Sequence, residues 1–266
     1  MSSSPTHAIE IREGERTGEA GAPAVRLANV SKSFGTRKVL DDVSFDVADG
    51  SGFIILGRSG TGKSVTLRHI IGLVQPDQGK VFVRGHEISG VRGNALALAR
   101  LDMGFLFQNA ALFDSISVGE NVAFPMRRHT NLSDRDIRDR AREKLQSVGL
   151  EHEFDKMPAD LSGGMKKRAG LARALALDPT VLLVDEPSAG LDPITSGEID
   201  DLLLHLKEHG GTTVIVVTHN IHSARSIGDD VLMLHEGRIL ARGTPAELDR
   251  SDDALVRAFM SSKNAG

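Results

Sequence analysis

One segment constrains the fold of this 266-residue chain more than any other, namely Gly57-Arg58-Ser59-Gly60-Thr61-Gly62-Lys63-Ser64. It matches the pattern G-x-x-x-x-G-K-[ST], and it lies between the apolar run 53–56 and a stretch with the apolar spacing of a helix. Glycines let consecutive backbone N–H groups converge on an anion, and the following helix presents its positive end to the same anion. The segment predicts a phosphate-binding loop, with Lys63 on the outer phosphates and Ser64 as a ligand of Mg²⁺. The alternative is a glycine-rich loop that matches by chance, and the strand–loop–helix context weighs against it.

Short β-branched runs alternate with helical stretches from residue 25 onward, which is typical of an α/β fold. Three runs are apolar at nearly every position, as strands covered on both faces should be: 53–56, 181–184 and 214–217. Three earlier runs lie close together and predict an antiparallel layer beside the main sheet: Val25–Val30, Val39–Val47 and Val81–Val83.

Helices are predicted mainly between residues 109 and 177. Ser133 and Asp136 resemble a capping box, and Gly149 stands where a C-terminal glycine belongs. The apolar face between them consists of Ile137, Ala141, Leu145 and Val148. A second helix should begin just after Leu161, and a third should stop at Gly210. The inner stripe of this third helix is predicted to be Ile199, Leu202, Leu203 and Leu206.

The end of the chain predicts a hairpin over residues 231–241 and a helix around Asp253–Met260. No internal repeat or long linker interrupts the pattern. We therefore expect one domain over residues 24–262 with a helical subdomain at about 109–177. The Ser-, Glu- and Gly-rich residues 1–23 are predicted to be a disordered tail, and residues 263–266 a short second tail.

Two adjacent acids, Asp185 and Glu186, directly follow the apolar run 181–184. They should lie at the carboxyl end of a central strand, where ligands bind in open α/β sheets. Asp185 can hold Mg²⁺ through its water shell, and Glu186, on the other side of the pleat, can polarise an attacking water. A surface turn with two acids is the alternative, and the four preceding apolar residues disfavour it.

The run Leu161-Ser162-Gly163-Gly164-Met165 predicts a second anion site, because a serine and two glycines open a helix there. Two phosphate cradles in a chain with one nucleotide suggest that the second cradle serves the nucleotide of a neighbouring copy. A glycine-rich helix cap without a ligand remains the alternative.

Composition excludes several classes of protein. The chain has no cysteine, which rules out disulfides, thiol catalysis and cysteine-held metals. Its formal charge of −4 argues against bulk electrostatic binding of nucleic acid or anionic lipid. No apolar run approaches the roughly 20 residues that span a bilayer, and no secretory signal is visible, so we expect a cytoplasmic protein.

His205 and His209 have the spacing of a shared metal site, but no third ligand is evident, and a solvated helix face is the better interpretation.

The phosphate loop, the Leu-Ser-Gly-Gly run, the Asp-Glu pair and a later Thr218-His219 occur in the order and spacing of the ATP-binding-cassette (ABC) ATPases, which this chain resembles over roughly residues 24 to 245. The resemblance implies a P-loop NTPase fold with a RecA-like core, an antiparallel β subdomain and a helical signature subdomain. It also implies transport-coupled ATP hydrolysis with Mg²⁺, and a head-to-tail homodimer in which each ATP lies between one phosphate loop and the partner's signature.

Further roles follow from the resemblance, position by position. Phe34 corresponds to the aromatic residue that stacks on adenine, where the family more often has tyrosine. Gln108 matches the glutamine that completes the Mg²⁺ shell and senses the transporter, Glu186 the general base, and His219 the histidine that touches the γ-phosphate. The loop Ser188–Asp192 matches the segment that crosses to the partner subunit. The implied catalytic residues are Lys63, Gln108, Glu186 and His219; the implied metal ligands are Ser64, Gln108 and Asp185; and the implied ATP-binding residues are Phe34, Gly57, Arg58, Ser59, Gly60, Thr61, Gly62, Lys63, Ser64, Val65, Ser162, Gly163, Gly164 and Asp192.

Four short sequence features resemble the ATPase of the Mla/MCE (maintenance of lipid asymmetry) phospholipid transporters: Phe107–Asp114, Asn121–Pro125, Asp192–Thr195 and Met165. This resemblance implies integral permease subunits, an MCE-domain protein and a small STAS-type accessory subunit as partners. It places the chain at the cytoplasmic face of the inner membrane. The segment 109–126 would receive a coupling helix of the permease, although its apolar residues could equally be ordinary core.

Two alternative functions remain open at this point. The nearest is the ATPase of an importer for amino acids or another small solute. The more distant is a soluble ABC ATPase acting on DNA or ribosomes, but this chain has neither an inserted coiled coil nor a second cassette. A metabolic P-loop kinase is weaker still, because it would not need the signature.

Overall fold

The computed structural model describes residues 22–261. Residues 1–21 and 262–266 lie outside the described part, and with them nearly all of the two predicted tails. The described chain forms two compact units, one of residues 109–178 and one of residues 22–108 and 179–261. Within residues 22–261, no helix combines the length and the apolar character needed to cross a bilayer.

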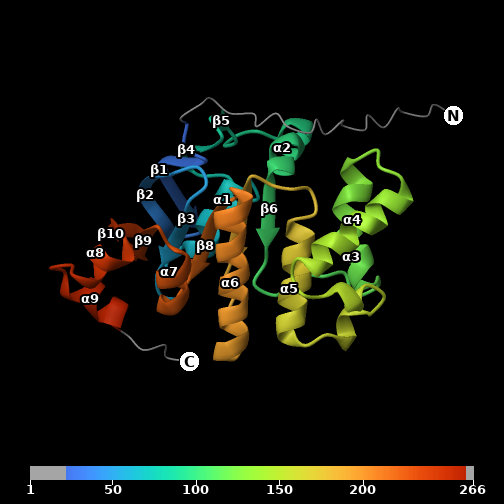
Figure 1. Ribbon diagram of the computed structural model, residues 1–266. Coiled ribbons are helices and arrows are strands. Elements are labelled where there is room, and N and C mark those ends of the chain that lie inside the picture. The colour runs from blue at the N-terminus through green and yellow to red at the C-terminus, as the bar shows by residue number, and fades with distance from the viewer. Residues whose placement is uncertain (1–21, 262–266) are drawn as a thin grey trace. The chain divides into compact units, whose positions relative to one another are not determined.

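The larger unit contains an antiparallel four-stranded sheet with the order β2-β1-β4-β5 (Figure 1). Its strands are β1 (Val25–Phe34), β2 (Arg37–Val47), β4 (Gln78–Val83) and β5 (His86–Glu87). The predicted antiparallel layer is therefore confirmed. The last part of β1 pairs irregularly, because its register against β2 shifts at Lys32 and again before Ser33.

A six-stranded sheet with the order β10-β9-β3-β8-β7-β6 forms the centre of the same unit. Its strands are β3 (Gly52–Leu56), β6 (Met103–Leu106), β7 (Val181–Asp185), β8 (Thr213–Thr218), β9 (Asp230–His235) and β10 (Arg238–Gly243). All neighbours are parallel except β10, which forms the predicted hairpin with β9. Every residue of β3, β7 and β8 is buried, as their apolar runs predict.

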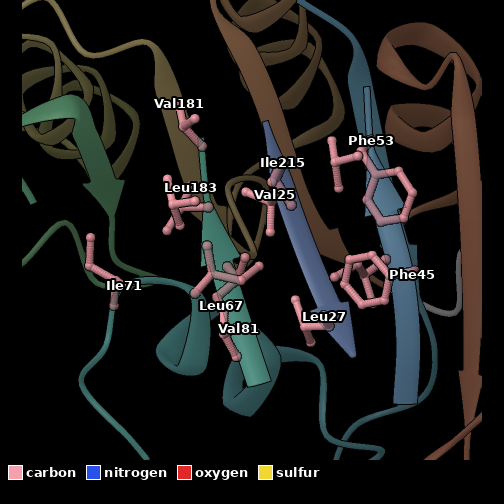
Figure 2. Packing of buried hydrophobic residues seen from close by; sticks show 14 of the residues in the cluster. Val25, Leu27, Phe45, Phe53, Leu67, Ile71, Val81, Val181, Leu183 and Ile215 are labelled. Atoms are coloured by element: carbon pink, nitrogen blue, oxygen red, sulfur yellow. The ribbon is translucent and has the colours of Figure 1, made fainter. Parts of the chain in front are cut away.

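Both sheets contribute to one hydrophobic core. Figure 2 shows Phe45 of β2 beside Phe53 of β3, and their rings stack with centroids 5.2 Å apart. Val25, Leu27 and Val81 join this core from the antiparallel sheet; Leu183, Ile215, Leu67 and Ile71 join it from the parallel strands and the helix that follows β3. Burial of each large apolar side chain contributes about 1.5–3 kcal/mol, so the core fixes the two sheets against each other.

The helices of this unit are α1 (Lys63–Ile70), α2 (Gly93–Ala99), α6 (Pro193–Gly210), α7 (Ile221–Ile227), α8 (Pro245–Asp249) and α9 (Ala254–Ser261). The predicted ends of α6 and α9 agree with these bounds. The predicted inner stripe of α6 is partly wrong: Ile199 and Leu203 are buried, but Leu202 and Leu206 are only half-buried. Asp200 is buried instead, with 1% of its surface exposed, because its carboxylate bonds to α7.

The smaller unit contains three helices, α3 (Val118–His129), α4 (Asp134–Gln146) and α5 (Gly163–Ala174), and α3 packs against the other two (Figure 1). The Ser133 hydroxyl caps α4 by accepting a hydrogen bond from the Asp136 amide at 3.2 Å, as predicted. Gly149 follows α4 with a left-handed φ of 69°. The predicted apolar face is fully buried: Ile137, Ala141, Leu145 and Val148.

Candidate functional site

The parallel register of the central sheet brings the predicted catalytic segments to one edge. The end of β3, Leu56, lies opposite Thr218 of β8, and Asp185 of β7 lies opposite Val217. The loop 57–64, Glu186 and His219 follow these strands directly, so their positions are a consequence of strand register. The Glu186 amide donates a hydrogen bond to the Val217 carbonyl at 2.9 Å, which holds the acid beside β8.

The predicted phosphate loop curls around the ammonium of Lys63. This group donates hydrogen bonds to the carbonyls of Gly57 at 2.8 Å and Arg58 at 3.1 Å, and the side chain is almost fully buried. Gly62 directly precedes α1 and has a left-handed φ of 105°, and no side chain caps the helix. The first amides of α1 therefore face the loop without a side-chain acceptor, which is the arrangement that binds phosphate at a helix start.

Two glycines of the loop are required by close packing. A Cβ atom at Gly57 would lie 2.6 Å from the Leu234 carbonyl oxygen, and one at Gly62 would lie 2.8 Å from the Val39 carbonyl oxygen. The loop is thus pressed against the backbone of β9 on one side and of β2 on the other. No residue with a side chain fits at either position without moving that backbone.

Glu186 lies between two cationic or polar partners. Its Oε1 is 3.3 Å from the Lys63 Nζ, and its Oε2 is 2.8 Å from the Nδ1 of His219. The backbone of Glu186 adopts a left-handed φ of 47°, a strained conformation for a residue with a side chain. The register of β7 against β8 and the contacts with Lys63 and His219 keep Glu186 in this strained conformation. The carboxylate predicted to be the general base is therefore fixed in orientation.

Ser64 and Asp185 form the second polar pair of the site. The Ser64 hydroxyl donates a hydrogen bond to Asp185 Oδ1 at 2.7 Å. Burial raises the pKa of Asp185, and the hydrogen bond from Ser64 opposes this rise. Among residues 22–261 no cluster of three His, Asp or Glu side chains could hold a metal alone. A hydroxyl and one carboxylate side by side instead fit Mg²⁺, which takes one or two protein ligands together with phosphate oxygens.

The remaining predicted residues of the larger unit are more exposed. Phe34 ends β1 with about half of its surface exposed, and Gln108 is exposed two residues after β6. In the loop, Arg58 and Ser59 are exposed, whereas Val65 is half-buried on α1. Asp192 caps α6, because its Oδ1 accepts hydrogen bonds from the amides of residues 194 and 195 at 3.0 Å.

The signature residues belong to the smaller unit. The Ser162 hydroxyl caps α5 by accepting a hydrogen bond from the Met165 amide at 3.3 Å. Ser162 and Gly163 are exposed, and Gly164 is buried. The helix cap considered for this run is therefore present, and it leaves the serine and the first glycine of the turn accessible to a ligand.

Two residues contact the site although sequence analysis did not select them. Arg37 donates a hydrogen bond from Nη2 to the Gly60 carbonyl at 3.0 Å. Asn220 caps α7 by accepting a hydrogen bond from the His222 amide at 2.8 Å, and so fixes the turn that carries His219. An asparagine before an apolar helical stretch is a recognisable cap signal, whereas nothing in the sequence marks Arg37.

Comparison with known proteins agrees with this geometry. The model of the ABC transporter family matches residues 40–189. A probable ribonucleotide transport ATP-binding protein, Mkl of Mycobacterium leprae, is 40% identical over 91% of this chain and 70% of its own length. The phospholipid transport ATP-binding protein MlaF of Haemophilus influenzae is 39% identical over 91% of this chain and 92% of its own. A dimeric ATP-binding cassette, MJ0796, solved with ADP and phosphate, has a TM-score of 0.78 and 34% identity over 83% of this chain and 98% of its own.

These matches define the class: the chain belongs to the ABC transporter family. It is an ATPase of that family with the P-loop fold that its motifs predict, and it binds ATP. Among its relatives are two MlaF proteins, so the predicted resemblance to the phospholipid branch is confirmed as a resemblance.

Proposed function

We propose that this chain hydrolyses ATP to power phospholipid transport between bacterial membranes as part of an MCE-type complex. The observation that carries the proposal is the pair of MlaF relatives from Haemophilus influenzae and Escherichia coli, which are 39% and 38% identical. This chain aligns with 92% and 89% of their lengths, so the similarity extends over most of both proteins. An Arabidopsis relative named trigalactosyldiacylglycerol 3 is 38% identical over 88% of this chain.

In this proposal each polar group at the sheet edge has its own role in phosphoryl transfer. The loop amides and Lys63 bind the phosphates of ATP, and Glu186 orients the attacking water and accepts its proton. His219, hydrogen-bonded to Glu186 at 2.8 Å, fixes that carboxylate and contacts the γ-phosphate. Ser64, Asp185 and Gln108 would hold Mg²⁺, which supplies neutralisation of phosphate charge.

The proposed assembly is a head-to-tail homodimer joined to integral permease subunits at the cytoplasmic face of the inner membrane. Ser162, Gly163 and Gly164 of one copy would complete the ATP site of the other, and Asp192 would lie in the loop that crosses to the partner. Supporting this, the related cassette MJ0796 was solved as a dimer with ADP and phosphate. An MCE-domain protein and a STAS-type subunit complete the proposed complex.

The surface proposed to receive the permease lies in the smaller unit. Phe113 and Phe124 are each nearly half exposed, and their ring centroids are 5.0 Å apart. Asn121 is fully buried, accepts a hydrogen bond from the Phe113 amide at 2.7 Å and donates one to the Phe113 carbonyl at 3.0 Å. Asn121, the first residue of the segment 121–125 that resembles the phospholipid branch, therefore has a structural role. The exposed rings provide an apolar contact surface.

Import of a small solute is the second candidate, favoured by one relative. A methionine import ATP-binding protein of Rhodopseudomonas palustris, MetN 2, is 41% identical over 89% of this chain. The match spans 63% of that protein's length, so more than a third of that protein lies outside the alignment.

Reconstitution distinguishes the two candidates. The chain is co-expressed with the membrane proteins that co-purify with it, and the complex is placed in liposomes that contain labelled phospholipid. ATP-dependent transfer of lipid to an acceptor, absent when the complex carries Glu186→Gln, is the expected result. An active complex that takes up methionine or another solute and transfers no lipid would refute the phospholipid proposal.

A further inference from the structure

The end of β1, which presents Phe34, is anchored by a carboxylate outside the sheet. Asp77 accepts a hydrogen bond from the Lys32 ammonium on Oδ1 and one from the Ser33 amide on Oδ2, each at 2.7 Å. The Asp77 amide donates to the Ser31 carbonyl at 2.9 Å. Three consecutive residues immediately before Phe34 are thus tied to one aspartate.

Such an anchor is needed because the sheet alone does not define this part of β1. The register against β2 shifts twice between Val30 and Ser33, and the register against β4 shifts before Ser31. The Ser33 amide donates a hydrogen bond to a carboxylate outside the sheet, that of Asp77. After Phe34 the chain turns through Gly35, which has a left-handed φ of 58°.

Lys32 connects the anchor to the aromatic ring itself. Its ammonium lies over the Phe34 ring, 5.5 Å from the centroid, while its side chain is 16% exposed. A cation over one face of an aromatic ring is attracted to it and restricts the ring's motion. About half of the Phe34 surface remains exposed, which leaves ring surface available for a planar ligand.

Asp77 also joins this aromatic to the phosphate-binding helix. Only a short turn separates it from α1, which begins with Lys63 and Ser64. Within that turn the amides of Leu73 and Val74 both return to the Arg68 carbonyl, at 2.8 and 3.1 Å. Asp77 thus links the segment that carries Phe34 to the chain that leaves α1, in addition to the direct hydrogen bond from Arg37 to Gly60 of the phosphate loop.

We propose that Asp77 is a positioning residue for nucleotide binding, which holds Lys32 and Phe34 so that the ring can stack on the base. This rests on the proposed role of Phe34. The Asp77 side chain is 47% exposed and contacts none of the catalytic groups at the sheet edge described above. Neither core packing nor catalysis therefore accounts for it. Phosphate contacts do not depend on the ring, so loss of Asp77 should weaken recognition of the base alone.

The test compares equilibrium binding of ATP with that of inorganic tripolyphosphate, which has no base, to the full chain. Phe34→Ala should raise the Kd for ATP about tenfold, the effect of losing one base stack, and leave tripolyphosphate unchanged. Asp77→Ala should raise the Kd for ATP about three- to tenfold, again without effect on tripolyphosphate. The double variant should bind ATP no more weakly than Phe34→Ala, because the two changes act through one contact.

Asp46→Ala is the matched control, because it removes an exposed ion pair, with Arg26 of β1, from the same sheet. It should bind both ligands as the wild type does. Asp77→Asn serves if the alanine variant does not fold: it keeps an oxygen for the Ser33 amide, loses the charge opposite Lys32, and should give a smaller loss of ATP affinity.

Each contrary result has a distinct meaning. Equal weakening of ATP and tripolyphosphate by Asp77→Ala, or additive effects in the double variant, would overturn the positioning role. If Phe34→Ala weakens ATP binding but neither Asp77 variant does, the inference fails while the proposed base site stands. If Phe34→Ala binds ATP normally, the base assignment fails and the inference fails with it.

Discussion

The buried carboxylate of Asp200 provides the most quantitative prediction. Asp200 of α6 is 1% exposed, and its Oδ2 accepts a hydrogen bond of 2.8 Å from the hydroxyl of Ser223 on α7. No hydrogen-bond donor within residues 22–261 reaches its other oxygen. Burial raises the pKa of Asp200 to about 6 from 3.8, against the opposing effects of the Ser223 hydroxyl and of nearby His222; Asp201 adds to the rise.

The sign and size of the effect follow from proton linkage. The folded chain keeps its proton on Asp200 up to about pH 6, whereas the unfolded chain loses it near 3.8. Stability therefore falls as the pH rises through this window, and the full cost is present above it. At about 1.4 kcal/mol per pKa unit, the cost is about 3 kcal/mol. Asp200→Asn keeps an acceptor for Ser223 and removes the charge, so the variant should be more stable at pH 8 by up to that amount.

Thermal unfolding between pH 5 and pH 8 measures this difference. For a chain of this size, about 3 kcal/mol corresponds to a rise in Tm of about 5–10 °C at pH 8, shrinking toward pH 5. Asp252→Asn, which neutralises an exposed aspartate between α8 and α9, is the charge-matched control and should give no pH-dependent difference. A difference for Asp200→Asn that does not change with pH, or a variant less stable at pH 8, would refute the reasoning.

Three further predictions concern the site and the smaller unit. Glu186→Gln should bind ATP and lower the steady-state rate of hydrolysis by at least about 10²-fold, whereas Glu236→Gln, an exposed glutamate that also has a left-handed φ, should hydrolyse ATP at the wild-type rate. Gly119→Ala should lower the free energy of unfolding by about 1–3 kcal/mol in chemical denaturation, because its Cβ would meet three ring carbons of Phe154 at 2.5 Å, and Phe154→Leu in the same chain should recover part of this loss. Asn121→Leu leaves the Phe113 amide and carbonyl without their partner; faster hydrogen exchange at the Phe113 amide is expected, and unchanged exchange would contradict the assigned bonds.

The three central strands and the position of the site follow closely from the sequence. The fully apolar runs could only be strands covered on both faces, and the residues after them had to meet at the carboxyl edge of a parallel sheet. This argument brings Lys63 and Glu186 together, and they lie 3.3 Å apart. His219 was selected only through the family resemblance, and the structure places it in hydrogen-bond contact with Glu186. The caps Ser133 and Ser162 were equally recognisable, because a hydroxyl before a helix satisfies an amide that the helix leaves open.

Other features depend on contacts that a single sequence does not reveal. The strand β6 was not predicted, because its four residues include a glycine and are too short to show a pattern. The burial of Asp200 was not predicted either, because only its hydrogen bond to Ser223 on α7 explains it. The contacts of Arg37 and Asp77 were not predicted for the same reason. Arg37 bonds to Gly60 and Asp77 to Lys32, and each bond joins segments that are far apart in the sequence.

The two glycines at the ends of the phosphate loop rest on the main chain of strands from different sheets, at Leu234 and Val39. The phosphate loop thus lies where the antiparallel and the parallel sheet meet. A substitution that shifts the backbone of β2 at Val39 or of β9 at Leu234 should therefore also shift the loop and change the affinity for ATP. The affinity for ATP should therefore also report on how the two sheets pack against each other.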